Sequence, residues 1–218
     1  MIPLLHDFTD ATVLVFGGGH VGARKARRFD REAHVIVVSP AFADREFGGA
    51  ELVRAAPEPD EVPDWLDRTA PALVVAATDD DAINDAIADA AHERGTLVNR
   101  ADRSGEREPG SVVVPATVRD DPVVVSIATG GQAPALSKYL RQELEETLSG
   151  AGEMAQVCAG VREELKSRDV AADRRREIVT DVVTSPDVWT ALRTGTSNSS
   201  QVIEDVLAKD LSTGGDRS

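Results

Sequence analysis

The sequence predicts an α/β protein built on a parallel sheet, followed by a small α+β segment and a set of carboxyl-terminal helices. Two observations lead to this fold class. Apolar, β-rich runs alternate with helical stretches as far as residue 99, which is the pattern of a parallel sheet covered by helices on both faces. Beyond residue 110, two apolar runs follow each other with no helix between them, and the remainder reads as helical. We expect domains at residues 1–112, 113–148 and 149–211, with a disordered tail at 212–218.

The first part of the chain reads as one strand–helix–strand unit. Residues 12–16 (TVLVF) are a continuous apolar run rich in β-branched residues, and three glycines follow directly. A helical stretch over 20–33 comes next, and a strand over 34–40 completes the unit. We expect a further short strand over 51–54. A proline-rich connection over 57–63 then leads onward.

The second half of this region repeats the theme. Residues 72–78 (ALVVAAT) are expected to form a buried strand. The stretch 79–95 reads as a helix, because it begins with acidic residues and ends at Gly95. Residues 96–99 (TLVN) form the next expected strand. Strands and helices therefore alternate throughout the first domain.

The pattern after residue 110 predicts a hairpin and then a helix. Strands are expected over 111–115 (SVVVP) and 122–129 (PVVVSIAT), with a turn at 119–121 before the second. The helix over 133–148 carries leucine at every fourth position, and such a hairpin with an apolar helix can pair two subunits. Three further helices are expected, over residues 153–167, 171–184 and 199–211, with a break at Ser185–Pro186.

The composition limits the classes of function. The chain has 218 residues and a formal net charge of −14, which argues against general nucleic-acid binding. No apolar run reaches the length that crosses a bilayer and the start has no basic leader, so a soluble cytoplasmic protein is expected. The single cysteine, Cys158, rules out an intrachain disulfide and is expected to be buried. The four histidines make no metal-ligand spacing, so no metal site is predicted.

The glycine turn predicts a dinucleotide site. Residues 17–22 (GGGHVG) fit G-x-G-x-x-G between a strand and a helix, the context that this motif requires. The free N–H groups and positive dipole end of such a helix suit a pyrophosphate. The alternative is a merely structural glycine turn. The residues expected to bind the cofactor are Gly17, Gly18, Gly19, His20, Val21, Gly22, Ser39, Pro40, Ala41 and Thr78.

Two positions near this site leave alternatives open. The second strand ends in Ser39-Pro40, where an acid would select NAD by binding the ribose 2′-hydroxyl, so the residues leave NAD against NADP undecided. Thr78-Asp79 end the next long strand at the edge where ligands bind. A cap for the following helix, made by Thr78 or Asp79, is an equal interpretation of those two residues.

Several stretches together resemble one family. The run VLVFGGGHVGARKARRF resembles the start of the precorrin-2 dehydrogenase / sirohydrochlorin ferrochelatase family, the amino-terminal half of siroheme synthases. AATDDDAIN, VNRAD and SIATGGQAPALSKYLRQELE are similar to later segments of that family, in the family's order. The resemblance covers residues 5–148. It implies a Rossmann-type domain, NAD as cofactor, dehydrogenation of precorrin-2 to sirohydrochlorin, and a homodimer formed through the middle segment. Some members also add Fe²⁺ to the product.

The resemblance also implies site residues. It places the catalytic carboxylate at Asp102, which would accept a proton while hydride leaves for the cofactor. The substrate-binding residues that it implies are Asn99, Thr129, Gly130 and Gly131. From the residues alone, Asp102 is better explained as capping a turn or as pairing with Arg100 or Arg103. Residues 129–134 can also be a turn followed by a helix cap, which is compatible with the substrate role. A cationic rim is expected for a substrate with many carboxylates, and its candidates are Lys25, Arg119, Lys138 and Arg141.

The sequence departs from the family in two places, and two other classes of protein compete with it. Arg100 stands where the family has an apolar residue, and the charged loop after Asp102 is longer than usual, which weakens the case for iron insertion. A non-catalytic NAD-sensing regulatory module is the main alternative, although it needs neither an acid at 102 nor the later hairpin. A glutamyl-tRNA reductase would need a cysteine early in the chain, and the one cysteine is Cys158.

Overall fold

The computed structural model describes residues 2–103, 110–194, 204 and 208. It divides the chain into two compact units, Met1–Val114 and Pro115–Ser218. The predicted segments 113–148 and 149–211 thus fall almost wholly in one unit. The predicted tail at 212–218 lies outside the described residues. The predicted helix over 199–211 does so too, apart from Glu204 and Ala208, which are helical.

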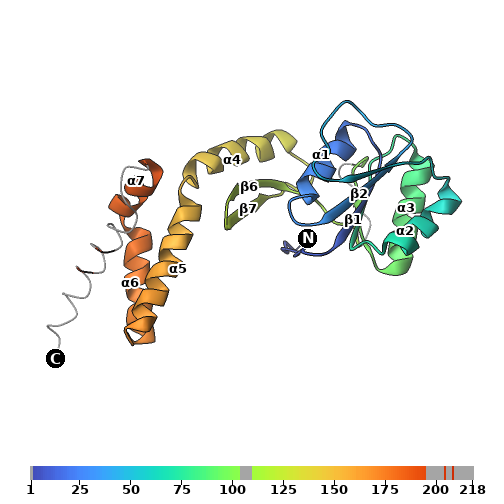
Figure 1. The fold of residues 1–218 in the computed structure, drawn as a ribbon. Coiled ribbons are helices and arrows are strands. Elements are labelled where there is room, and N and C mark those ends of the chain that lie inside the picture. Colours follow the sequence, from blue (N-terminus) through green and yellow to red (C-terminus); the bar gives the residue numbers. More distant parts are fainter. Residues whose placement is uncertain (1, 104–109, 195–203, 205–207, 209–218) are drawn as a thin grey trace. The chain divides into compact units, whose positions relative to one another are not determined.

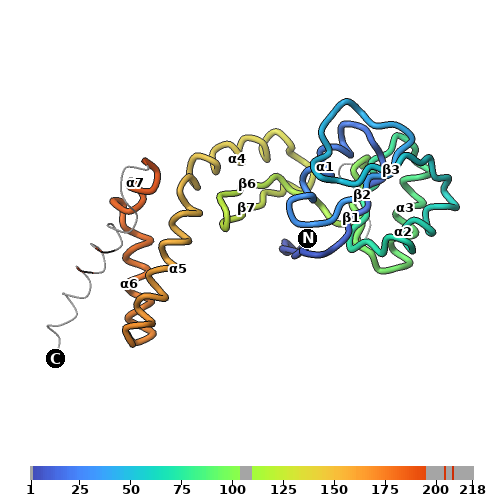
Figure 2. The backbone as a smooth tube through the Cα atoms, viewed as in Figure 1, coloured from blue at the N-terminus to red at the C-terminus, as the bar shows by residue number. Residues whose placement is uncertain are grey.

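The first unit contains a five-stranded parallel sheet. Its strands are β1 (Thr12–Phe16), β2 (His34–Ser39), β3 (Glu51–Arg54), β4 (Leu73–Ala76) and β5 (Leu97–Arg100). They lie in the order β3-β2-β1-β4-β5, and every neighbouring pair is parallel. Figure 2 shows β1, β2 and β3 side by side. The predicted α/β class with a Rossmann-type sheet is confirmed. The chain reverses its direction of sheet growth after β3, so the carboxyl ends of β1 and β4 form the edge where such folds bind ligands.

Helices cover both faces of this sheet (Figure 1). On one face, α1 (His20–Phe29) packs Ala23 and Ala26 against Val13 and Val15 of β1. The opposite face is covered by α2 (Val62–Thr69) and α3 (Asp81–Arg94), which pack against the alternate β1 side chains, Leu14 and Phe16. Because successive side chains point to opposite faces, a strand covered on both sides must be apolar throughout. This is why TVLVF reads as an uninterrupted run.

Helix α2 corrects the predicted proline-rich connection. Pro59 starts a short 3₁₀ turn over Pro59–Glu61, and Pro63 lies in the first turn of α2. Proline is tolerated there because the first N–H groups of a helix have no intrahelical partner. Val62 and Leu66 are buried against the sheet, so packing stabilises a helix in a stretch where the prolines favour a connection.

The second unit starts with an antiparallel hairpin, β6 (Ala116–Asp120) and β7 (Val123–Ile127). The predicted first strand over 111–115 is wrong. Ser111 instead makes a single parallel bridge to Val98, and Val112 N–H donates to the Val98 carbonyl at 2.8 Å. The apolar run thus continues the first sheet's edge, and the less apolar residues after it form the hairpin strand.

Within residues 110–194, four helices follow the hairpin: α4 (Pro134–Thr147), α5 (Ala151–Ser167), α6 (Ala172–Thr184) and α7 (Pro186–Thr194). Helix α7 is absent from the sequence prediction, which places a break at Ser185–Pro186, whereas Pro186 starts the helix.

The core of these helices is small. Val161 and Leu165 of α5 and Ile178 of α6 are fully buried in it, and Cys158 packs at its margin. Partial burial raises the pKa of the Cys158 thiol. Across the described part of the chain, no helix has the length and apolar character needed to cross a membrane.

Candidate functional site: a nucleotide turn and two polar clusters

The turn after β1 requires glycine at its first and last positions. Gly17 has φ +117°, and a Cβ there would lie 2.2 Å from the Ala77 carbonyl oxygen. A Cβ on Gly22 would lie 1.8 Å from the Gly17 carbonyl oxygen. Both distances are far below contact, so the first glycine permits the turn and the last lets α1 approach the strand.

Gly19 differs from these two, because its free side faces open space. A Cβ on Gly19 would meet nothing within 4 Å, and the residue is the amino-terminal cap of α1 with no side-chain cap bond. No acidic residue lies in the first turn of α1. The helix therefore presents uncapped N–H groups and its positive dipole end beside unfilled space. This arrangement fits the pyrophosphate of a dinucleotide, with residues 19–22 as its cradle.

The loop after β2, where the adenosine side of the site is predicted, lies against Gly18. Ser39 is buried, and its hydroxyl donates to the Ala41 carbonyl at 2.7 Å. Ala43 N–H donates to the Gly18 carbonyl at 2.8 Å, so this loop and the glycine turn are joined. Arg54 donates to the exposed Pro40 carbonyl at 3.1 Å. The end of β2 carries no carboxylate to select against a 2′-phosphate.

His20, at the end of the glycine turn, also contacts the loop that follows β2. Arg45 Nε donates to His20 Nδ1 at 3.1 Å. Val21, the next residue, is half-buried. The predicted cofactor residues of the turn and of the β2 end thus lie together in one unit. Their contact with a nucleotide stays a prediction.

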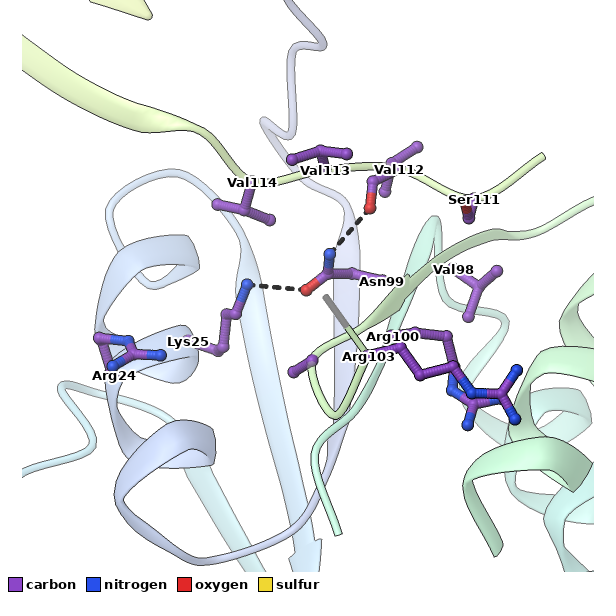
Figure 3. A pocket seen from close by; sticks show the side chains of 11 residues that line it. Arg24, Lys25, Val98, Asn99, Arg100, Arg103, Ser111, Val112, Val113 and Val114 are labelled. Carbon is purple, nitrogen blue, oxygen red and sulfur yellow. Dashed lines mark hydrogen bonds between the residues drawn. The ribbon is translucent and has the colours of Figure 1, made fainter. Parts of the chain in front are cut away.

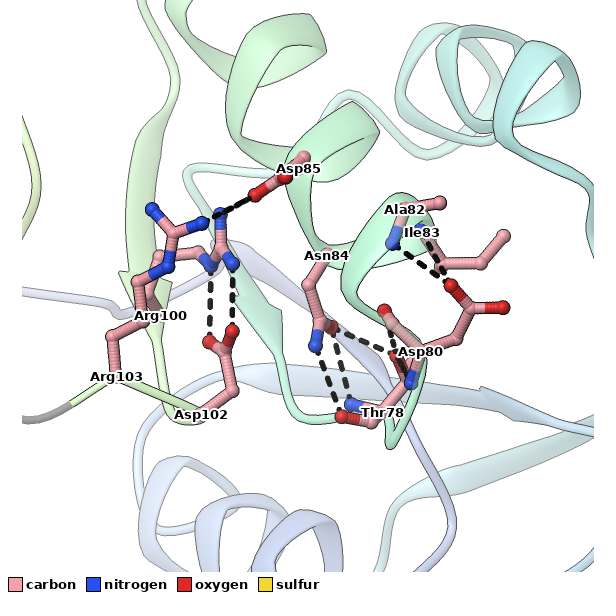
Figure 4. Close-up of polar contacts among 9 residues, drawn as sticks. All are labelled: Thr78, Asp80, Ala82, Ile83, Asn84, Asp85, Arg100, Asp102 and Arg103. Carbon is pink, nitrogen blue, oxygen red and sulfur yellow. Dashed lines mark hydrogen bonds and ion pairs between the residues drawn. The ribbon is translucent and has the colours of Figure 1, made fainter.

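Thr78 is held by a polar cluster at the start of α3 (Figure 4). Its hydroxyl lies 2.9 Å from Oδ1 of the fully buried Asn84, whose Nδ2 donates to the Thr78 carbonyl at 2.9 Å. The cap of α3 is Asp80, which accepts from Ala82 N–H at 2.8 Å and Ile83 N–H at 3.3 Å. The alternative interpretation of Thr78 or Asp79 as the cap is therefore wrong. The asparagine in AATDDDAIN is the sequence signal for this cluster, and the sequence prediction gave it no role.

Asp102 lies just beyond β5 in a bidentate ion pair with Arg100. Arg100 Nε and Nη2 donate to its two carboxylate oxygens at 3.0 and 2.6 Å, and Nη1 donates to Asp85 of α3 at 2.7 Å (Figure 4). The exposed fractions of the Arg100 and Asp102 side chains are 9% and 15%. Hydrogen bonding to Arg100 lowers the pKa of the Asp102 carboxyl despite partial burial. Asp102 is therefore ionised at neutral pH and fixed in direction.

This pairing is the one that the residues alone indicated for Asp102. It does not test the catalytic role that the family resemblance implies, because a paired carboxylate can still face a substrate. Arg100 is the residue at which the sequence departs from the family, and it supplies the pairing.

Asn99 joins α1 to the segment after β5 (Figure 3). Lys25 Nζ donates to Asn99 Oδ1 at 2.7 Å, and Asn99 Nδ2 donates to the Val112 carbonyl at 2.8 Å. Asn99 is 5% exposed, so both ends of its amide are engaged inside the protein. The predicted substrate contact of Asn99 stays a prediction, and the structure gives it a positioning role.

Lys25 is a partly buried lysine, and its environment predicts a dependence of stability on pH. Burial, reinforced by repulsion from Arg28 and Arg24, lowers the pKa of Lys25 from 10.5 to about 8. Below pH 8 the amine is protonated in the folded and the unfolded chain alike. Between pH 8 and 10.5 the unfolded chain binds more protons, so this group makes the free energy of unfolding rise with pH.

We expect Lys25→Met to remove that rise. Urea unfolding at pH 8 and at pH 10 measures it, and the change in wild type minus the change in the variant isolates Lys25 from the other groups that titrate there. The expected difference is at most about 3 kcal/mol. Equal pH dependence in the two proteins would show that Lys25 has an ordinary pKa.

The predicted substrate residues of the middle segment belong to the second unit. The alternative interpretation of residues 129–134, a turn followed by a helix cap, agrees with the structure, in which Ala133 caps α4 and the turn before it starts from Thr129. The Thr129 hydroxyl donates to the Ala133 carbonyl at 3.2 Å and lies 2.9 Å from Ser137 Oγ, so it braces the first turn from outside. Gly130 and Gly131 both have positive φ. Their contact with substrate stays a prediction.

The other basic candidates for a substrate rim also lie in the second unit. Arg141 pairs with Glu145, one turn along α4, and Arg119 lies 3.9 Å from Asp121. In the described ranges, no group of three or more His, Cys, Asp or Glu side chains is placed to hold a metal ion.

The fold and the glycine turn define the class of protein. A parallel sheet with a glycine-rich turn between its central strand and the first helix is a dinucleotide-binding domain of the Rossmann type. In agreement, an NAD(P)-binding family matches residues 4–116. A nicotinamide dinucleotide is thus the cofactor of this domain.

Similar proteins narrow the class further. The precorrin-2 dehydrogenase of Methanosarcina barkeri (strain Fusaro / DSM 804) is 30% identical over 197 residues, which cover 86% of this chain and 85% of its own. The siroheme synthase of Stutzerimonas stutzeri (strain A1501) is 31% identical over 95% of this chain but only 44% of its own length. The chain therefore spans less than half of that relative. A solved structure titled "SirC, precorrin-2 dehydrogenase" shares the fold, with TM-score 0.68 and 21% identity over 95% of this chain and all of its own. The chain belongs to the family of precorrin-2 dehydrogenases and siroheme synthases.

Proposed function

We propose that the protein catalyses the NAD-dependent dehydrogenation of precorrin-2 to sirohydrochlorin, a step of siroheme biosynthesis. The observation that carries the proposal is the likeness to the M. barkeri precorrin-2 dehydrogenase, because it extends over 86% of this chain and 85% of that one, and not over the nucleotide domain alone. The proposal covers this step only, since the chain spans 44% of the siroheme synthase from S. stutzeri.

Cofactor binding and proton removal would be carried out by different residues. The Gly17–Gly22 turn and the uncapped start of α1 would hold the dinucleotide, which would supply the hydride acceptor for the reaction. A proton must also leave the substrate, and Asp102 is an ionised carboxylate at the same edge of the sheet. Arg100 directs this carboxylate but lowers its proton affinity. Asp85 gives Arg100 a second acceptor, so the guanidinium keeps a partner when Asp102 takes a proton.

The test is a turnover assay with precorrin-2 and NAD, followed by sirohydrochlorin absorbance and by NADH formation. We expect one NADH per sirohydrochlorin, because hydride transfer links the two products. NAD binding without turnover, at the salt concentration where the protein is folded, would instead support the NAD-sensing regulatory module. A parallel assay uses NADP in place of NAD, because Ser39 stands where a carboxylate would repel the 2′-phosphate of NADP.

Iron insertion into sirohydrochlorin is a separate expectation of the family resemblance, with Fe²⁺ as a substrate. No cluster in the described ranges favours it. Adding Fe²⁺ to sirohydrochlorin, with and without the protein, tests it. A rate equal to that of the uncatalysed reaction would reject it.

We also propose that the protein is a homodimer formed through the second unit. In support, α4 contains no buried residue, and Leu136 and Tyr139 on it are 48% and 56% exposed. An apolar helix face of this kind is stabilised when a second copy covers it. Sedimentation equilibrium of the full chain measures the association state, and a monomer at all concentrations would reject this proposal.

A further inference from the structure

A cavity of about 190 Å³ lies in the first unit between α1, the end of β5 and the segment Ser111–Val114 (Figure 3). Sites for whole drug-sized ligands run to about 300–1,000 Å³, so this one is sized for one arm of a larger molecule. Arg24 and Lys25 line it from α1, and Val112 to Val114 line it from the opposite side. The proposed roles of the glycine turn and of Asp102 leave this cavity without a function.

Lys25 provides an uncompensated positive charge in this cavity. Its ammonium has three donors, and its one hydrogen bond among the described residues goes to the neutral amide of Asn99. No carboxylate of the described chain forms an ion pair with it. Its charged neighbours are Arg28 and Arg24, both of which repel it. Burial of a cation in positive surroundings is costly unless an anion joins it.

The other two basic residues of the lining do not change this balance. The guanidinium groups of Arg100 and Arg103 turn away from Lys25 and donate to Asp85 on the far side of β5, at 2.7 and 2.8 Å (Figures 3 and 4). Asp85 and Asp102 are therefore already paired with those arginines and do not neutralise Lys25. The positive charge at the α1 side of the cavity stays available for a ligand in a chain whose net charge is −14.

We propose that this cavity is an anion subsite in which Lys25, with Arg24 at its rim, binds one carboxylate arm of the substrate. The assignment of this carboxylate to a tetrapyrrole substrate rests on the proposed dehydrogenation reaction. A carboxylate here accepts a charge-assisted hydrogen bond from Nζ, which Asn99 holds in position from the other side. Asn99 acts through Lys25 and is a positioning residue.

The first experiment uses the wild-type protein and does not depend on turnover. The chain has four lysines (Lys25, Lys138, Lys166 and Lys209), whose reductive methylation by formaldehyde and cyanoborohydride is followed site by site by mass spectrometry. Propionate is the probe, propionamide the neutral control, and chloride at equal ionic strength the simple-anion control. We expect propionate alone to slow methylation of Lys25 about threefold or more, because an anion occupies the cavity and favours the unreactive ammonium. Lys166, exposed on α5, should be unaffected.

The second experiment ties the subsite to the substrate. Lys25→Met removes the charge and keeps the apolar stem, Lys25→Arg keeps the charge, and Lys166→Met is the matched control. We expect Lys25→Met to raise the KM for precorrin-2 about tenfold, the equivalent of one lost charged contact. The dissociation constant for NAD should stay at the wild-type value. Lys25→Arg should recover part of the loss, and Lys166→Met should behave as wild type.

The outcomes separate this proposal from the proposed reaction. Protection by propionate in a protein that fails to dehydrogenate precorrin-2 supports the anion subsite and rejects the reaction. Protection with an unchanged KM in Lys25→Met rejects the assignment to the substrate. Equal methylation of Lys25 with and without propionate, or equal protection by chloride, overturns the carboxylate subsite whatever the turnover. If Lys25→Met does not fold, the methylation experiment alone decides.

Discussion

Gly22→Ala is expected to destabilise the first unit by about 3 kcal/mol or more and to abolish NAD binding. The new methyl group would lie 1.8 Å from the Gly17 carbonyl oxygen, so α1 must move away from the turn that precedes it. A loss of that size is a large part of the roughly 5–15 kcal/mol that stabilises a typical domain. Thermal unfolding by circular dichroism, together with NADH fluorescence titration, measures both effects.

Gly19→Ala is the matched control within the same turn. Its φ of −78° suits any residue, and its Cβ would meet no protein atom within 4 Å, so stability should change by less than about 1 kcal/mol. The methyl group would nevertheless enter the space assigned to the pyrophosphate. We expect the dissociation constant for NAD to rise about tenfold or more. Unchanged affinity in Gly19→Ala would contradict the assignment of the cradle, whereas a stable Gly22→Ala protein would contradict the packing argument.

Asp102→Asn is expected to lower kcat for precorrin-2 dehydrogenation by about 10²- to 10⁴-fold, the usual contribution of a general base. Asparagine keeps the shape and one acceptor oxygen, and Arg100 keeps its bond to Asp85, so folding and NAD affinity should persist. Steady-state turnover and NADH fluorescence titration give the two readings. Because its pKa is below the ordinary range, Asp102 is ionised throughout the neutral region, and its titration should not limit the wild-type rate there.

Asp67→Asn serves as the control for the loss of an arginine pair. Asp67 accepts from Arg94 Nε at 2.7 Å and Nη2 at 3.2 Å, in the same unit and the same bidentate geometry as the Asp102 pair. It joins α2 to α3 and should leave kcat at the wild-type level. Wild-type turnover in Asp102→Asn would reduce Asp102 to a structural partner of Arg100.

The sheet and the nucleotide turn could be predicted because local patterns encode them. A strand buried on both faces has to be apolar at every position, and TVLVF directly before three glycines combines that signal with the turn that ends the strand. Helix α2 escaped prediction because Pro63 suggests a connection, whereas burial of Val62 and Leu66 outweighs that local signal. The first hairpin strand was misplaced for a similar reason, since SVVVP has strand character but pairs with the edge of the first sheet.

The sequence positions of the candidate site residues could be predicted, but the contacts between their side chains could not. The resemblance gave Asp102 and Asn99, and both lie at or just beyond the carboxyl end of β5. Lys25 and Asn99 are 74 residues apart, so their hydrogen bond depends on packing that no local pattern records. The same holds for Arg100, which departs from the family pattern and which bridges Asp102, just beyond β5, to Asp85 on α3.

The Asn99 amide has a consequence for where the nucleotide-binding unit can be cut. Its Nδ2 donates to the Val112 carbonyl, and the Val112 N–H donates to the Val98 carbonyl of β5. Two hydrogen bonds therefore hold the irregular stretch around Val112 against the sheet. A fragment truncated after β5 would leave a buried amide donor without an acceptor, at about 1–3 kcal/mol. An excised module for fusion or crystallisation must therefore carry the chain through Val114, although its last strand ends at Arg100.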